Sequence, residues 1–365
     1  LRSAPCRTTN AGHAIRSTQH GMTPATLRRV EQGLVPFHPL RHMGPVAELM
    51  AEAFAGELGP WARQTLRRMQ RIARWGALGF LLWGMGLDQE SPGFVWVEEG
   101  QVVGNISFRR AATAGGWMIG NVAVHPQWRG RSIGRALVEA ALDDIAARGG
   151  TWVGLEVRED NPAARRLYER LGFEAVGASL ELARPEGQPW PEASRSSLPL
   201  RRARAAESGD LYSLAREGLA RTHQEVLEIR PSLYRAGWEA RLSAWLEGRN
   251  EDWWVLRVGK DLAGVAPNGA LRLTSCRSGR WHEVEVLIRP ERMDDLGGLL
   301  VRAALALLAR RPAWETVTAL PGIRMHLEPL FADAGFRPLR RLLQMRRTLG
   351  TSIQIQPRRP EGTKE

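Results

Sequence analysis

The pattern of hydrophobic residues changes twice between residues 117 and 157. Apolar residues follow a strand-like pattern up to Val124, and beyond Ile133 they recur at the spacing of an amphipathic helix that ends at Gly149. Residues 151–157 then alternate between the two faces of a strand. The pattern therefore predicts a strand, a loop, a helix and a second strand.

A second helix is predicted directly after that strand. Asn161 has the side chain of a helix N-cap, Pro162 suits the first helical position, and Gly172 ends the helix. An apolar stripe at helical spacing lies between them and includes Tyr168. Strands and helices therefore alternate through this region.

The loop before the first of these helices has the features of an anion-binding site. Backbone N–H groups in the first turn of a helix have no intrahelical partner, and the positive end of the helix dipole lies beside them. Gly130 and Gly134 let the backbone approach an anion closely. We therefore expect residues 129–136 to bind a pyrophosphate group.

These segments resemble the two signature sequences of the Gcn5-related N-acetyltransferase (GNAT) superfamily. The pattern Gln/Arg-x-x-Gly-x-Gly/Ala corresponds to residues 129–134, although Ser132 stands where the family usually has glycine. We expect Ser132 to keep a negative φ, as most residues with a side chain do. The pattern Asn-x-x-Ala-x-x-Leu-Tyr-x-x-x-Gly-Phe corresponds to residues 161–173, so both signatures occur in the family's order.

The resemblance implies that the protein uses acetyl-CoA as a co-substrate and needs no metal. It also implies that the strand ending at Val124 separates from its neighbour, so that a backbone N–H at or near Val124 is free to bind the thioester oxygen. The residues expected to contact acetyl-CoA are Val122, Ala123, Val124, Arg129, Gly130, Arg131, Ser132, Ile133, Gly134, Arg135 and Asn161.

Two residues are candidates for proton transfer. Tyr168 matches the tyrosine of the second signature and is the candidate general acid, because a phenol with a pKa near ~10 is protonated at neutral pH. Its alternative role is that of a core tyrosine. Glu156 is the candidate base, directly or through water, because it faces away from the apolar side of its strand and because residues 155–158 resemble ribosomal-protein alanine acetyltransferases. A solvated strand glutamate is the alternative.

A second copy of the pattern follows a linker at residues 184–197. Residues 125–141 align without a gap with residues 289–305, and residues 167–173 align with residues 330–336. The repeat indicates duplication of a whole domain. The predicted fold class is α/β of the α+β type, with two tandem acyl-CoA N-acyltransferase folds, each a mixed, mostly antiparallel central sheet flanked by helices.

The second copy lacks the residues that the chemistry needs. Acidic side chains stand at the loop positions, where they repel phosphate, and no proton-transfer group remains. The replacements are Met293 for Arg129, Asp294 for Gly130, Asp295 for Arg131, Ala319 for Glu156, Arg324 for Asn161 and Phe331 for Tyr168. We therefore expect a degenerate second domain and assign no site residue to it.

These predictions divide the chain into segments. The expected parts are a flexible or mis-assigned N-terminal arm at 1–34, a catalytic domain at 35–183, the linker at 184–197, a degenerate domain at 198–349 and a polar tail at 350–365. Within the catalytic domain we expect a strand at 35–39, a helix at 45–54, a helical region at 60–83 and the acceptor pocket at 55–90.

Composition limits the compartment and the partners. The net charge of +12 comes almost entirely from dispersed arginines, so nucleic-acid binding is not expected. The two cysteines cannot build a disulfide framework, no Cys/His spacing suits a metal, and the apolar run at 76–87 is too short to cross a bilayer. We expect a cytoplasmic protein without a metal or a membrane partner, and the sequence leaves a homodimer open.

The preferred function is an N-acetyltransferase that moves an acetyl group from acetyl-CoA to a primary amine by direct attack. The tandem organisation favours a small-molecule acceptor, whereas a protein N-terminus of the ribosomal-protein alanine type is the alternative acceptor. A non-catalytic acyl-CoA-binding sensor is the alternative from another functional class, and the presence of Tyr168 argues against it.

Overall fold

The computed structural model describes residues 32–54, 63, 70, 93–190, 200–257 and 267–350. We call residues 32–190 the first half and residues 200–350 the second half. The first half contains β1 (Gly33–Pro36), α1 (Pro39–Ala53), β2 (Gly93–Glu98), β3 (Gln101–Arg110), β4 (Gly116–Val124), α4 (Ile133–Ala147), β5 (Trp152–Arg158), α5 (Pro162–Arg170) and β6 (Glu174–Arg184). The second half contains β7 (Leu200–Arg202), α6 (Ser208–Arg216), α7 (Arg221–Val226), α8 (Trp238–Leu246), β8 (Arg249–Leu256), β9 (Gly269–Cys276), β10 (Trp281–Ile288), α9 (Met293–Leu308), β11 (Glu315–Pro321), α10 (Glu328–Ala332) and β12 (Arg337–Thr348).

The strands of the described residues form one 12-stranded sheet in the order β1-β2-β3-β4-β5-β12-β6-β11-β10-β9-β8-β7. Neighbouring strands are antiparallel except for the pairs β4·β5 and β10·β11, which are parallel. The mixed, mostly antiparallel sheet flanked by helices has the predicted α+β class. The two sheets expected for the two halves are joined into one.

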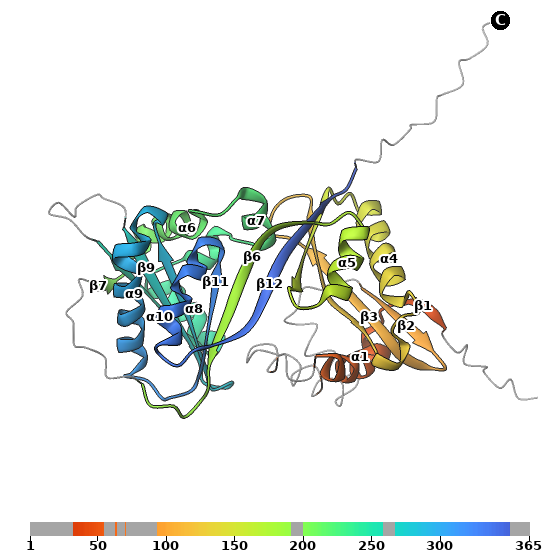
Figure 1. The fold of residues 1–365 in the computed structure, drawn as a ribbon, viewed down its shortest axis with the longest axis horizontal. Coiled ribbons are helices and arrows are strands. Elements are labelled where there is room, and N and C mark those ends of the chain that lie inside the picture. Colours follow the sequence, from red (N-terminus) through yellow and green to blue (C-terminus); the bar gives the residue numbers. More distant parts are fainter. Residues whose placement is uncertain are drawn as a thin grey trace, which may run out of the picture. The chain divides into compact units, whose positions relative to one another are not determined.

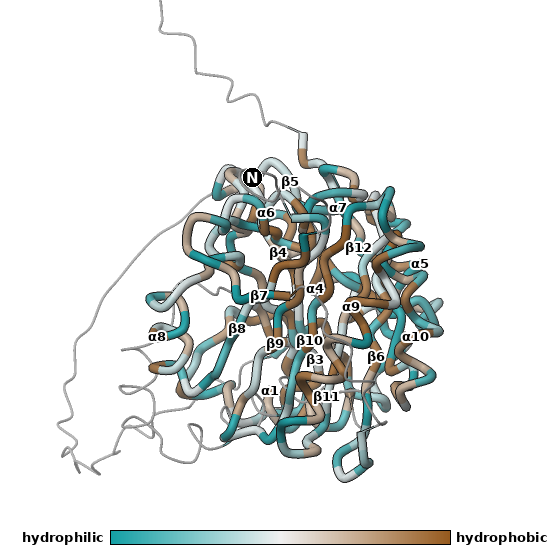
Figure 2. The backbone as a smooth tube through the Cα atoms, turned by 90° about the vertical axis from the view of Figure 1, so that its left-hand side faces the viewer, coloured by the Kyte–Doolittle hydropathy of each residue, from teal (hydrophilic) through white to brown (hydrophobic). Residues whose placement is uncertain are grey.

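Helices cover both faces of the sheet in the first half. Apolar residues of α4, such as Leu137 and Ile145, pack with β3, β5 and α5 in one buried cluster. On the opposite face Val46 of α1 packs against Val95 and Val97 of β2. Figure 2 shows a hydrophobic stretch along β4, as expected for a strand that is buried between helices.

The last strand of each half completes the sheet of the other half. β6 pairs with β11 of the second half, whereas β12 is inserted between β5 and β6. Figure 1 shows β6 and β12 running side by side between the two groups of helices. The domain boundary expected between residues 183 and 198 stays a prediction, and these exchanged strands tie the two halves together across it.

Strands β4 and β5 separate soon after they begin. They pair only over residues 116–118 and 152–154, and β4 then bulges at Asn121, whose φ is 55°. Side chains hold the bulge, because Asn105 Nδ2 donates to Asn121 O at 2.9 Å and Asn121 Nδ2 donates to Ser107 Oγ at 2.8 Å. The second part of β4 therefore borders a gap, as predicted.

The first strand and helix begin earlier than predicted. β1 spans Gly33–Pro36, and α1 begins at Pro39, so that Pro45 lies inside the helix. Proline suits the first helical position, and packing of the following residues against the sheet maintains the helix past its second proline. The helical region expected at 60–83 and the acceptor pocket expected at 55–90 lie outside the described residues, apart from residues 63 and 70.

Candidate active site

Two residues in the left-handed region shape the loop between β4 and α4. After the 3₁₀ turn η1 (Pro126–Trp128), Gly130 has a φ of 80° and Ser132 has a φ of 61° and a ψ of 9°. The negative φ expected for Ser132 is therefore wrong. The chain turns sharply at this residue to enter α4, and serine adopts the conformation at a cost of roughly 1–2 kcal/mol.

Three backbone N–H groups at the start of α4 have no hydrogen-bond partner in the described part of the chain. Ala136 N donates to Ser132 O at 3.0 Å, so the N–H groups of Ile133, Gly134 and Arg135 precede the hydrogen-bonded part of the helix. The side chain of Ser132 does not cap them. The donors and the positive end of the helix dipole form a site that suits a phosphate group.

The arginines of this loop are held in different ways. Arg129 Nε donates to Val124 O at 3.1 Å, and the guanidinium of Arg131 lies over the ring of Trp128 at 4.5 Å from the ring centre. Arg135 pairs with Glu139 one turn along α4, at 2.8 Å. The partners of Arg129 and Arg131 are therefore uncharged and leave their positive charges beside the free N–H groups, whereas Glu139 balances the charge of Arg135.

The end of β4 directs a backbone N–H into the gap between β4 and β5. His125 N donates to Val103 O on the β3 side at 2.9 Å. Because neighbouring residues of a strand direct their N–H groups to opposite sides, the N–H of Val124 points to the β5 side, beyond the last β4·β5 pair. Ala123 is buried, and Val122 and Val124 are half-buried against the core. These residues therefore form an apolar edge along the gap.

Tyr168 of α5 is buried and stacks edge-to-face on Phe173, with ring centres 5.8 Å apart. Its hydroxyl has no hydrogen-bond partner among the described residues, but it is not one of their fully buried unpaired polar atoms. Burial raises the pKa of Tyr168 to about 12. The phenol is therefore protonated at neutral pH and has a proton to donate.

Asn161 has the predicted capping role, because its side chain accepts a hydrogen bond from Ala164 N at 3.0 Å. Glu156 of β5 is an exposed residue, but one oxygen of its carboxylate contacts the buried side chain of Gln344. Desolvation raises the pKa of Glu156, whereas the hydrogen bond that Gln344 Nε2 donates to its carboxylate at 2.7 Å lowers it. A carboxylate with a raised pKa is a stronger base.

The structure places the two proton-transfer candidates on opposite faces of the sheet. Leu155 and Val157 pack with Tyr168 in the cluster beneath α4 and α5. Glu156 lies between them in the strand and therefore faces the other side, which α7 covers. The start of α4, with the loop at residues 129–132 before it, lies on the same face as Tyr168, and Glu156 lies on the opposite face.

The sequence analysis missed two polar residues beside Glu156. Gln344 of β12 is fully buried, and His223 of α7 is buried next to it. Gln344 interrupts an apolar strand sequence, Leu-Leu-Gln-Met, which marks it as unusual but does not identify its partner. Nothing in the sequence around His223 marks that residue.

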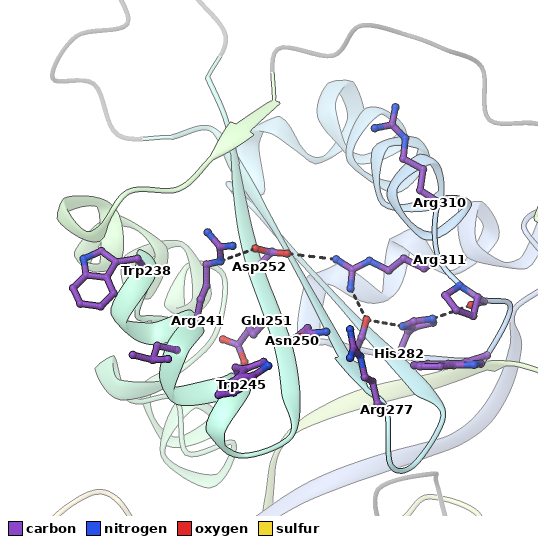
Figure 3. Close-up of a pocket in the computed structure, with 14 residues that line it drawn as sticks. Trp238, Arg241, Trp245, Asn250, Glu251, Asp252, Arg277, His282, Arg310 and Arg311 are labelled. Atoms are coloured by element: carbon purple, nitrogen blue, oxygen red, sulfur yellow. Dashed lines mark hydrogen bonds and ion pairs between the residues drawn. The ribbon is translucent and has the colours of Figure 1, made fainter.

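A separate cavity of about 800 Å³ lies in the second half, between α8, the first residues of β8 and β10, and the connection from α9 to β11. Figure 3 shows its polar wall, in which Asp252 pairs with Arg241 at 3.2 Å and Arg311 at 3.5 Å. Ser275 Oγ bonds both Arg311 and His282. The cavity adjoins the end of β10 opposite to the start of α9, so it is not the counterpart of the loop at residues 129–132.

None of the helices in the described ranges combines the length and hydrophobicity of a membrane-spanning segment. The same residues contain no group of three or more His, Cys, Asp or Glu side chains placed to hold a metal ion.

Comparison with known proteins identifies the region that contains the loop and Tyr168. Residues 48–173 match the Acetyltransferase (GNAT) family. A mycothiol acetyltransferase from Thermobispora bispora is 34% identical over 158 residues, which cover 41% of this chain and 50% of that protein. A [ribosomal protein bS18]-alanine N-acetyltransferase from Escherichia coli is 47% identical over 53 residues, which cover 14% of this chain and 36% of that protein.

The chain thus spans half or less of the length of these curated relatives. Among solved structures, a tandem GNAT protein from the clavulanic acid biosynthesis pathway superposes with a TM-score of 0.55 at 18% identity, covering 88% of this chain and 99% of that one. This similarity extends over both halves and shows the fold.

Proposed function

We propose that the first half, whose residues 48–173 match the Acetyltransferase (GNAT) family, transfers an acetyl group from acetyl-CoA to a primary amine by direct attack. The observation that carries the proposal is the set of three free N–H groups at the start of α4, next to the gap between β4 and β5. This arrangement suits a ligand with a pyrophosphate at one end and a narrow arm at the other.

The residues around the loop and gap would hold acetyl-CoA. The N–H groups of residues 133–135, with Arg129 and Arg131, bind the pyrophosphate, and the apolar edge at residues 122–124 lines the acetyl-pantetheine arm. Asn161 uses its side-chain oxygen for the helix cap, so its amide nitrogen remains for the arm. The described residues 289–308 of the second half form no equivalent loop, so we propose one acetyl-CoA site per chain.

The proposed reaction forms a C–N bond and breaks the C–S bond of the thioester. The N–H of Val124 binds the carbonyl oxygen as negative charge develops on it. Glu156 accepts a proton from the attacking nitrogen, directly or through water, and Tyr168 donates its proton to the leaving thiolate. The products are an amide and free coenzyme A; Glu156 releases its proton to solvent and the tyrosinate regains one. Tyr168 and Glu156 lie on opposite faces of the sheet. This arrangement suits a reaction in which the amine and the thiol occupy opposite sides of the acetyl carbon.

A thiol-release assay with a panel of amines tests the proposal. We expect release with at least one small primary amine and, by calorimetry, one acetyl-CoA per chain. Binding of acetyl-CoA without release for any amine would favour the non-catalytic sensor. Two bound molecules of similar affinity would contradict the single-site assignment.

A protein N-terminus is the second candidate acceptor. The short, highly identical match to the bS18-alanine enzyme supports it, whereas the longer match to a mycothiol acetyltransferase supports a small amine. Peptides with an N-terminal alanine in the same assay distinguish the two. We place the reaction in the cytoplasm because the chain has only two cysteines, too few for a disulfide framework.

A further inference from the structure

A buried hydrogen-bond network connects Glu156 to the second half. Gln344 Nε2 donates to Glu156 Oε1 at 2.7 Å and to Ser179 Oγ at 2.9 Å, and Gln344 Oε1 lies 3.1 Å from His223 Nε2. The side chain of Gln344 has no exposed surface. All the polar atoms of its amide are therefore used, and its orientation is fixed.

The chemistry of the partners determines which way the amide points. An ionised Glu156 can only accept, so the NH₂ group of Gln344 must face it and the oxygen must face His223. Burial lowers the pKa of His223, so its ring is neutral at pH 7 and carries one proton. That proton must be on Nε2 to satisfy the Gln344 oxygen. His223 thus selects the amide orientation that donates to Glu156.

The backbone is shaped to accept His223. A Cβ atom on Gly177 of β6 would lie 2.2–2.3 Å from atoms of the His223 ring, so only glycine leaves room for it. Val226 of the same helix packs against Met118 and Trp152 of the first half. An ion pair also joins α7 to β12, because Arg346 Nε lies 3.2 Å from Glu225 Oε2. Helix α7 is therefore held on the face of β5 that carries Glu156.

We propose that the amine side of the active site is composite: Gln344 is a positioning residue that holds the Glu156 carboxylate, and His223 holds Gln344. Both residues come from the second half, Gln344 by way of the exchanged strand β12. The inference rests on the proposed function, since it assumes that Glu156 takes the proton of the amine. It gives the second half a part in the reaction although residues 289–305 form no such loop and Phe331 stands at the position that corresponds to Tyr168.

The test compares the titration of Glu156 in the wild type and in Gln344→Met, a variant of similar length that cannot donate. The hydrogen bond from Gln344 lowers the pKa of Glu156, so its loss should raise that pKa further. Glu181 and Glu228 also raise the pKa of Glu156, and Arg340 lowers it; these groups are unchanged in the variant. Carboxyl ¹³C NMR against pH, assigned with Glu156→Gln, measures the shift without any acetyl transfer.

In the active enzyme the acidic limb of the kcat/KM profile should move to higher pH. Because the carboxylate is no longer held in place, kcat/KM above that limb should also fall roughly tenfold, with an unchanged Kd for acetyl-CoA. Ser179→Ala is the matched control, because it removes the other acceptor of the same amide. It keeps the Gln344–Glu156 bond, so it should shift the acidic limb and lower kcat/KM less than Gln344→Met does. A folded Gln344→Met protein with an unchanged Glu156 titration would overturn the proposal.

A second pair of variants decides the question if Gln344→Met does not fold. His223→Leu removes the donor to Gln344 and should shift the Glu156 titration in the same direction by less, whereas His223→Gln restores a donor and should reverse the shift. Identical titrations in both variants would overturn the proposal. Failure of the proposed function looks different: the wild type would release no thiol with any amine, while the NMR titration would still report the Gln344–Glu156 bond.

Discussion

The two halves differ in backbone conformation at four residues, which directly precede α4 in the first half. In the first half the loop at residues 129–132 separates η1 from α4. In the second half η4 (Pro290–Arg292) runs directly into α9, which begins at Met293, and none of the residues 289–308 has a positive φ. One turn of helix therefore replaces the loop.

The positive end of the helix dipole faces different groups in α4 and α9. In α9 Asp294 and Asp295 occupy the first turn, and Asp295 pairs with Arg292 at 2.6 Å, so the helix is stabilised by its own carboxylates. The first turn of α4 has no acidic residue. The sequence alignment predicted the loss of the anion site from the acidic side chains and from the replacement of Gly130 by Asp294; the structure shows that a turn of helix replaces the loop conformation there.

A pair of aromatic rings is retained in both halves. Tyr168 and Phe173 lie 5.8 Å apart at 66°, and Phe331 and Phe336 lie 5.1 Å apart at 73°. Packing of this kind does not need the hydroxyl, since Phe331 forms the same contact without it. The hydroxyl of Tyr168 is therefore the feature that separates the two halves at this position.

The largest effect should follow from separating the halves. A fragment of residues 1–190 lacks β12, so β5 gains a free edge and β6 loses both partners. We expect its Tm to fall by roughly 10 °C or more and the fragment to associate through the exposed strands. Thermal unfolding and size-exclusion chromatography measure both effects.

The control for this experiment is the missing piece itself. Residues 191–365, produced separately and added to the fragment, should restore the Tm and the monomeric state if the exchanged strands are what was lost. A fragment that is monomeric and as stable as the whole chain would contradict the prediction. It would show that β6 can fold back onto β5 and replace β12.

Local signals in the sequence predicted the loop, α4, α5 and the cap at Asn161, because each depends on residues close together in the chain. The exchange of β6 and β12 could not be predicted, since both strands have the same alternating pattern and would satisfy either arrangement. The contact between Gln344 and Glu156 depends on that exchange, so it was equally hidden. The left-handed conformation of Ser132 was missed because the turn demands it against the preference of serine.

Introducing a carboxylate into the first turn of α4 should weaken the binding of acetyl-CoA, since it copies the acidic first turn of α9. A Cβ atom on Gly134 would lie 3.7 Å from Val124 and Leu167 side-chain atoms, which is an ordinary contact, so Gly134→Ala should bind acetyl-CoA within threefold of wild type. Gly134→Asp adds a negative charge among the free N–H groups and should raise the Kd roughly 100-fold, or about 2.7 kcal/mol. Calorimetry measures both variants. Similar Kd values for the two would argue that no phosphate binds here.

Tyr168→Phe gives the first half the aromatic pair of the second. The ring pair remains while the proton is lost, so kcat should fall roughly 10²-fold with little change in the Kd for acetyl-CoA. Because the pKa of Tyr168 is about 12, the wild type should show no alkaline limb from this residue below about pH 11. Tyr234→Phe, at a buried tyrosine of the second half, is the matched control and should leave kcat unchanged. An unchanged kcat in Tyr168→Phe would return Tyr168 to a core role.

The smallest effect should come from Ser132→Gly, which relieves a strain that the second half does not have. Glycine adopts a φ of 61° without the clash of a Cβ atom, but it also makes the unfolded chain more flexible. The gain in the free energy of unfolding should therefore be only about 0.5–1 kcal/mol, since a cost of roughly 1–2 kcal/mol is offset in part. Gly130→Ala, the opposite change at a φ of 80°, should destabilise by about 1 kcal/mol. Denaturant unfolding measures the stability of both variants. A loss of stability in Ser132→Gly would mean that contacts of the serine side chain stabilise the protein by more than its strained φ costs.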